Sequence, residues 1–205
     1  AAAALLTLPA SSLGAQARTP AELRASVQRY VRAHDAAILD ELRELLAIPN
    51  VATDTLGIRR NAAHLQEMLR SRGFTTELLE APSGRQVPPA VFAEMRVAGA
   101  RRTVVFYAHY DGQPVNPKQW HPGLEPFAPV LITAPLESGG RIVGPYKAGE
   151  PVDDSHRLSG RGSADDKAGI AAHLVERDQA MEVVEGRVLH PLGHGRAGEL
   201  LEAHH

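Results

Sequence analysis

The sequence predicts an α/β fold in which a mixed or parallel sheet is flanked by helices in three layers. Helix and strand patterns alternate along the chain, which favours this layered arrangement. Residues 103–109 form an apolar run without the polar alternation of a half-exposed strand. We therefore expect this run to be a strand at the centre of the sheet.

Three helices are expected around that sheet. The first begins at a capping box that Thr19 opens, with proline in the first helical position, and it ends before Pro49. The second is amphipathic and ends at Gly73, a typical C-cap residue. The third begins at about Asp166, after a glycine-rich turn.

Two further strand patterns, at residues 75–81 and 90–97, lie between the second helix and the central run. From Gly112 to Ser159 the chain is rich in proline and glycine. A connection of this length is unusual for an unstructured loop, so we expect it to be functional or locally structured.

Charge and cysteine content exclude some classes of protein. The 205 residues include 22 basic and 24 acidic side chains, for a formal net charge of -2, and no cysteine. A dedicated nucleic-acid-binding protein would usually carry a basic stripe, so we expect no nucleic-acid partner. The lack of cysteine excludes a disulfide framework.

Residues 1–17 differ from the rest because they carry no charge and are small and apolar. They end in Ala15-Gln16-Ala17, an A-x-A pattern typical of signal-peptide cleavage. We interpret them as the remnant of a signal peptide, and a disordered alanine-rich leader is the alternative. The apolar stretch is shorter than the roughly 20 residues that span a membrane. We expect a secreted or periplasmic protein with no membrane contact after signal removal.

The central run ends at His109, and Asp111 follows two residues later. Sites in open α/β sheets form beyond the carboxyl ends of strands. Residues i and i+2 of an extended segment point to the same side, so the Asp111 carboxylate can approach the His109 ring. That contact would leave the other ring nitrogen free for a metal. A buried histidine paired with aspartate without a metal is the alternative, and it is the commoner explanation of a lone H-x-D.

A second group of polar residues follows Gly160 and Gly162, where Asp165 and Asp166 stand at a helix start. In one interpretation, one aspartate caps the helix and the other is solvated, since helix N-termini favour carboxylates. Alternatively, one faces a cation and the other faces outward, with the glycines allowing close approach. Lys167 is expected to be a solvated helix residue.

Together these stretches resemble a known family. HYDGQP at residues 109–114 and GRGSADDKAG at residues 160–169 are similar to motifs of the co-catalytic di-zinc metallopeptidases of family M-twenty. That family includes carnosinases, aminoacylases, carboxypeptidase G and succinyl-diaminopimelate desuccinylase. Trp120 with the following EPFAPVL also resembles its dipeptidase branch, and the resemblance covers about residues 35–175.

The resemblance implies a zinc-peptidase catalytic domain and roles for three residues. His109 matches a ligand of one zinc ion, Asp165 matches the carboxylate that bridges two zinc ions, and Asp111 matches the aspartate that orients the ligand histidine. In the family a water held between the two ions attacks the peptide carbonyl, with a glutamate as general base. The implied substrate is a small peptide or N-acyl amino acid, and the full-length form is expected to include a lid domain and to allow a homodimer.

The chain also departs from that pattern. The family's adjacent pair of glutamates is absent from the sequence. We therefore expect residues 18–175 to be the N-terminal part of a catalytic domain that is truncated and lacks the lid. Residues 176–205 are weakly patterned and read like a frameshifted end. His190 and His194 are four apart, but the neighbouring proline and glycines argue against a helical ligand pair.

Three alternatives to a working peptidase remain at this point. The first is a non-catalytic remnant or a partner-dependent fragment that retains two ligand positions without a base. A serine hydrolase is disfavoured because no G-x-S-x-G occurs in the sequence. A dinucleotide site is disfavoured because Gly160 and Gly162 lack the third spaced glycine.

Overall fold

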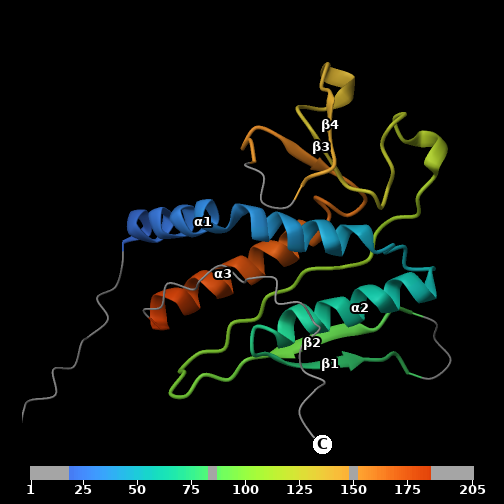
Figure 1. Cartoon of the computed structure of the whole chain (residues 1–205). Coiled ribbons are helices and arrows are strands. Elements are labelled where there is room, and N and C mark those ends of the chain that lie inside the picture. Colours follow the sequence, from blue (N-terminus) through green and yellow to red (C-terminus); the bar gives the residue numbers. More distant parts are fainter. Residues whose placement is uncertain (1–18, 83–86, 148–151, 186–205) are drawn as a thin grey trace, which may run out of the picture.

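The computed structural model describes residues 19–82, 87–147 and 152–185. In these ranges three α-helices pack together, with one small antiparallel sheet beneath α2 and another above the second half of α1 (Figure 1). None of the helices in the described part of the chain has the length and apolar character of a membrane-spanning segment. The fold combines helices and sheets, as predicted, but the described sheets are antiparallel rather than mixed or parallel, and the three layers stay a prediction.

The helices begin where local sequence signals place them. In α1, Pro20–Ala47, the Thr19 side chain accepts a hydrogen bond from the Glu22 backbone N–H, which completes the predicted capping box. Asp54 caps α2, Thr55–Arg70, by accepting from the Gly57 N–H. The third helix, α3, spans Lys167–Glu185, within one residue of its expected start.

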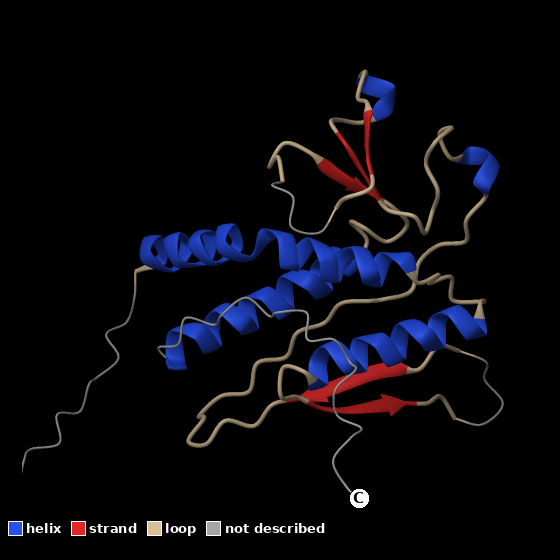
Figure 2. Ribbon diagram, viewed as in Figure 1, coloured by secondary structure: helices blue, strands red, loops and turns tan. Residues whose placement is uncertain are grey.

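Both sheets are antiparallel and small. Strands β1, Thr75–Leu79, and β2, Ala90–Glu94, form a hairpin that α2 covers on one face (Figure 2). The long proline- and glycine-rich stretch contains local structure, as expected. It forms a sheet of order β4-β3-β5 and two short 3-10 helices; the elements are β3, Val130–Ile132; β4, Ile142–Gly144; β5, Arg157–Ser159; η1, Pro117–Gln119; and η2, Leu136–Ser138.

The hydrophobic core joins the three helices. Leu45 of α1, Leu65 and Met68 of α2, and Leu174 of α3 are all buried and form one cluster. Burying a side chain of this size contributes roughly 1.5–3 kcal/mol. The core therefore fixes the end of α1 relative to α3, the two helices that approach the candidate site.

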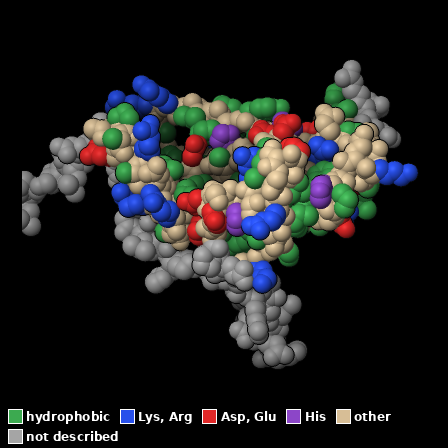
Figure 3. All heavy atoms as spheres, turned by 90° about the horizontal axis from the view of Figure 1, so that it is seen from above, with side chains coloured by type: hydrophobic (Ala, Val, Ile, Leu, Met, Phe, Trp, Pro, Cys, Tyr) green, Lys and Arg blue, Asp and Glu red, His purple; other side chains and the backbone are tan. Residues whose placement is uncertain are grey.

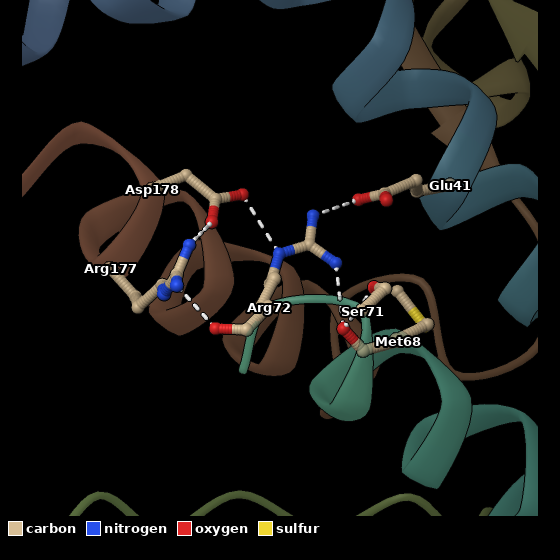
Figure 4. A network of polar contacts seen from close by, with 6 residues as sticks. All are labelled: Glu41, Met68, Ser71, Arg72, Arg177 and Asp178. Atoms are coloured by element: carbon tan, nitrogen blue, oxygen red, sulfur yellow. Dashed lines mark hydrogen bonds and ion pairs between the residues drawn. The ribbon is translucent and has the colours of Figure 1, made fainter. Parts of the chain in front are cut away.

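A buried arginine adds a polar connection among the same helices (Figure 4). Arg72, which is 9% exposed, donates from Nη2 to Glu41 of α1 at 2.6 Å and from Nε to Asp178 of α3 at 2.8 Å. Its Nη1 also donates to the carbonyl of Met68 at 3.0 Å, and Arg177 donates to the Arg72 carbonyl. Thus α3 continues past residue 175, and residues from its second half pack on the rest of the fold.

The prediction of a central strand at residues 103–109 is wrong. Residues 103–109 run as a loop with no strand pairing (Figure 2), and the first five are exposed, with Val105 at 85% and Tyr107 at 82%. Each observed sheet pairs within itself, so no described strand lies beside this run. Within the described residues, the parallel pairing is limited to one isolated bridge between Val51 and Gly112.

Candidate functional site

Two loops line a pocket of about 210 Å³. One consists of residues 109–113, directly after the exposed run, and the other is the turn at residues 160–165 before α3. The second turn includes Gly162, whose φ of 79° lies in the left-handed region that glycine adopts without strain. Seen from above, acidic, basic and histidine side chains lie close together on the molecular face (Figure 3).

His109 and Asp165, the two expected zinc ligands, meet in this pocket. The His109 Nε2 lies 2.8 Å from Asp165 Oδ1, although the two residues are 56 apart in the chain. The Asp165 side chain is 85% exposed and that of His109 37% exposed. A ligand entering from solvent therefore has access to both side chains.

Asp111 contacts the other nitrogen of the same ring. Its Oδ1 lies 3.2 Å from His109 Nδ1, and its main-chain carbonyl lies 3.0 Å from that nitrogen. The approach expected from the i, i+2 spacing is thus present, and Asp111 restrains the ring plane. The hydrogen bond to Asp165 raises the pKa of His109, and Asp111 adds to this while burial opposes it.

Asp166 faces the same histidine from the backbone side. Its Oδ2 accepts a hydrogen bond from the His109 main-chain N–H at 3.4 Å. The two adjacent aspartates therefore contact different parts of one residue, with Asp165 at the ring edge and Asp166 at the main chain. This arrangement leaves the Asp165 carboxylate as the more accessible of the pair.

Lys167 corrects the expectation of a solvated residue, because it is fully buried. Its Nζ donates to the carbonyls of Leu45 at 2.7 Å and Ile48 at 3.2 Å, at the end of α1. The last carbonyls of a helix lack intrahelical donors and favour a cation, and the last turn of α1 contains no basic residue. Burial lowers the pKa of Lys167 to about 7.

Asn50 is a site residue that the sequence patterns did not single out. It is fully buried, and its main-chain carbonyl accepts from the Gly112 N–H at 2.8 Å. Its side-chain Nδ2 donates to the Tyr110 carbonyl at 3.0 Å. A polar residue in the otherwise apolar stretch LLAIPNV was the available signal, since buried amides usually have a specific partner.

The donor types at the pocket fit zinc, but their number does not. Imidazole nitrogen and carboxylate oxygen are ordinary zinc ligands, and catalytic zinc takes three protein ligands. Among residues 19–82, 87–147 and 152–181, no group of three histidine, aspartate or glutamate side chains is placed to hold a metal ion. His109 and Asp165 would thus supply only part of a zinc centre.

Other histidines and segments named in the sequence analysis lie outside the residues that the structure describes. The tail histidines, His190, His194, His204 and His205, lie outside the described residues, as does the leader at residues 1–17. The interpretation of these segments stays a prediction, as does the proposed domain boundary at residue 175.

Comparison with solved structures shows which known proteins share this fold. No family model matches the sequence, and no curated protein matches it. Among solved structures, the chain is similar to the dipeptidase Dug1p of Saccharomyces cerevisiae, at 20% identity and a TM-score of 0.57, and to human carnosine dipeptidase 1, at 23% identity and a TM-score of 0.56. Each match covers 80% of this chain and 32% of the other, so the chain spans about a third of either dipeptidase. The described structure therefore has the fold of part of a dipeptidase, as the resemblance implied.

Proposed function

We propose that this chain supplies part of a zinc-dependent peptidase centre that hydrolyses peptide or amide bonds in dipeptides or N-acyl amino acids. The observation that carries the proposal is the contact between His109 Nε2 and Asp165 Oδ1 at 2.8 Å, with Asp111 on the opposite ring nitrogen. The fold shared with two dipeptidases supports it.

In this proposal each side chain has a separate task. His109 presents Nε2 to the pocket, and Asp111 holds the ring orientation through Nδ1. Asp165 provides an exposed carboxylate, and the turn around Gly162 leaves room beside it for a substrate main chain. Bound zinc supplies Lewis acidity, which polarises a carbonyl and lowers the pKa of a coordinated water.

The second candidate function is a non-catalytic or partner-dependent fragment. It is favoured because, among residues 19–82, 87–147 and 152–181, no group of three histidine, aspartate or glutamate side chains is placed to hold a metal ion. Hydrolysis then requires ligands and a general base from outside the described part of the chain. Both candidate functions use the same zinc-binding residues, but only the peptidase centre would hydrolyse a substrate.

Zinc titration calorimetry combined with a dipeptidase assay tests both candidates. The 205-residue chain is expected to bind zinc, and His109→Ala and Asp165→Ala are each expected to weaken binding by more than about 100-fold, because loss of outer partners alone costs 10–100-fold. Turnover that both variants abolish supports a complete peptidase centre. Zinc binding without turnover supports the fragment, and zinc affinity that neither variant changes contradicts the proposal.

A further inference from the structure

Asn50 lies beneath the pocket, between its two loops. We propose that Asn50 is a positioning residue whose buried amide holds the loop carrying His109 against the turn carrying Asp165. The inference deepens the proposed function and rests on it only for the zinc-binding consequence. The arrangement of the two loops follows from contacts that do not involve a metal.

The first set of contacts fixes the His109 loop. Asn50 accepts from the Gly112 N–H through its main chain and donates to the Tyr110 carbonyl through its side chain. Asn50 thus bonds to the residue before Asp111 and to the residue after it. Asp111, which contacts the His109 ring, is therefore held through the main chain of both its neighbours.

The second set of contacts brings in the Asp165 turn. A β-carbon on Gly112 would lie 2.9 Å from Asn50 Nδ2, and one on Gly162 would lie 3.0 Å from the same atom. Both distances are shorter than ordinary van der Waals contact, so the amide packs closely against two glycines, one from each loop. The close approach explains why both positions lack a side chain.

The segment that carries Asn50 is itself held firmly. Asn61 donates from Nδ2 to the Pro49 carbonyl at 2.6 Å. Lys167 donates to the carbonyls of Leu45 and Ile48, and its main-chain N–H donates to the Gly162 carbonyl at 3.0 Å. A lysine at the start of α3 thus links the segment to the same turn that Asn50 contacts.

The Asn50 amide also has a buried oxygen, Oδ1, without a hydrogen-bond partner among the described residues. A buried polar atom without a partner is destabilising, so an apolar side chain would be favoured if packing were the sole requirement. The donor on Nδ2 and its contacts with the two loops therefore account for an asparagine here.

The experiment measures loop positions without a metal. Because the chain has no cysteine, His109→Cys together with Asp165→Cys introduces the sole pair of thiols. Dibromobimane becomes fluorescent when it joins two nearby thiols, so its rate of reaction reports how closely the two loops are held. Zinc affinity is measured separately, by calorimetry, in chains that retain both ligands.

Asn50→Ala is compared with Gln66→Ala in both assays. Gln66 is a matched control, since it is 8% exposed, its amide donates to Thr76 of β1 at 3.2 Å, and neither residue lines the pocket. Asn50→Ala is expected to lower the crosslinking rate, and to lower the zinc affinity at least about tenfold, in the range typical of residues that position metal ligands. Gln66→Ala is expected to change neither.

Gly112→Ala disturbs the packing of Gly112 against the Asn50 amide from the side of the loop. If circular dichroism shows that Asn50→Ala does not fold, Gly112→Ala takes its place as the deciding variant. It is expected to reduce crosslinking in the same way. Crosslinking at the wild-type rate in Asn50→Ala, or in Gly112→Ala where that variant decides, overturns the inference. If the unaltered chain binds no zinc, the proposed function fails, while the crosslinking rates still decide the role of Asn50.

Discussion

Residues 45–50 and residues 103–107 are both largely apolar segments, yet one is mostly buried and the other is exposed. In the first, Leu45, Leu46 and Asn50 are fully buried, and Lys167, Asn61 and Gly112 bond to the main chain. In the second, all five side chains are exposed and the main chain belongs to no sheet. The difference teaches that apolar composition leads to burial only where other elements provide both packing and hydrogen-bond partners.

A large effect is expected at Arg72, which joins the helices that enclose the first segment. Arg72→Ala leaves Glu41 unpaired and Asp178 with Arg177 alone, so the free energy of unfolding should fall by about 3 kcal/mol in urea denaturation, the low end for a broken buried pair. Arg59→Ala is the matched control, because Arg59 pairs with Glu80 at 2.8 Å while both side chains are about half exposed. Its loss should have little effect on stability, because exposed ion pairs are screened by solvent. Equal losses would show that the Arg72 cluster is no more stabilising than a surface pair.

A direct test compares Leu45→Ala with Val105→Ala. Leu45 is 0% exposed, and its truncation should lower the free energy of unfolding by about 2–5 kcal/mol. Val105 is 85% exposed, and its truncation should change stability by less than about 0.5 kcal/mol. Chemical denaturation of both variants measures the difference. A loss above about 2 kcal/mol for Val105→Ala would mean that the second segment is packed against something in solution.

Lys167→Met tests the polar support of the first segment. The substitution leaves the carbonyls of Leu45 and Ile48 without their donor, so stability near neutral pH should fall by about 1–3 kcal/mol. Lys118→Met, at an exposed position, is the control and should have no measurable effect. An unchanged stability in Lys167→Met would contradict the proposed support.

The same lysine predicts a pH dependence of stability. Its pKa is about 7 in the folded chain and 10.5 in the unfolded chain, so between these values the unfolded state binds more protons. The contribution of Lys167 to the free energy of unfolding therefore rises with pH from about 7 to about 10.5. Urea denaturation across this range should show the rise in the wild type relative to Lys167→Met. Parallel pH profiles would show that the lysine titrates normally.

The smallest change in stability is expected at Asp111. Asp111→Asn keeps the shape of the side chain that contacts His109, and the position is 46% exposed. Unfolding free energy should change by less than about 0.5 kcal/mol. Zinc affinity should still fall by about 10–100-fold, because the ring loses its carboxylate partner. Unchanged affinity would show that Asp111 does not orient the ring.

Features set by near neighbours in the sequence were predictable. The capping box at Thr19 and the contact between His109 and Asp111 both depend on residues two or three positions apart, and the structure contains both. The start of α3 was predicted for the same reason, since a glycine turn before a helical pattern is a local signal.

Features that depend on distant partners were not predictable by the same reasoning. Lys167 is buried because the end of α1, 122 residues earlier in the chain, offers it carbonyls. Asn50 acquires its role from Tyr110, 60 residues later. Residues 103–107 have the composition of a central strand, but strand formation requires neighbours that the described residues do not supply.

The proposed function requires that His109 and Asp165 bind a common metal ion, and anomalous diffraction from zinc-soaked crystals locates that ion. We expect a zinc peak in contact with both His109 Nε2 and an Asp165 carboxylate oxygen. A well-occupied zinc elsewhere, with these two side chains still bonded to each other, would contradict it.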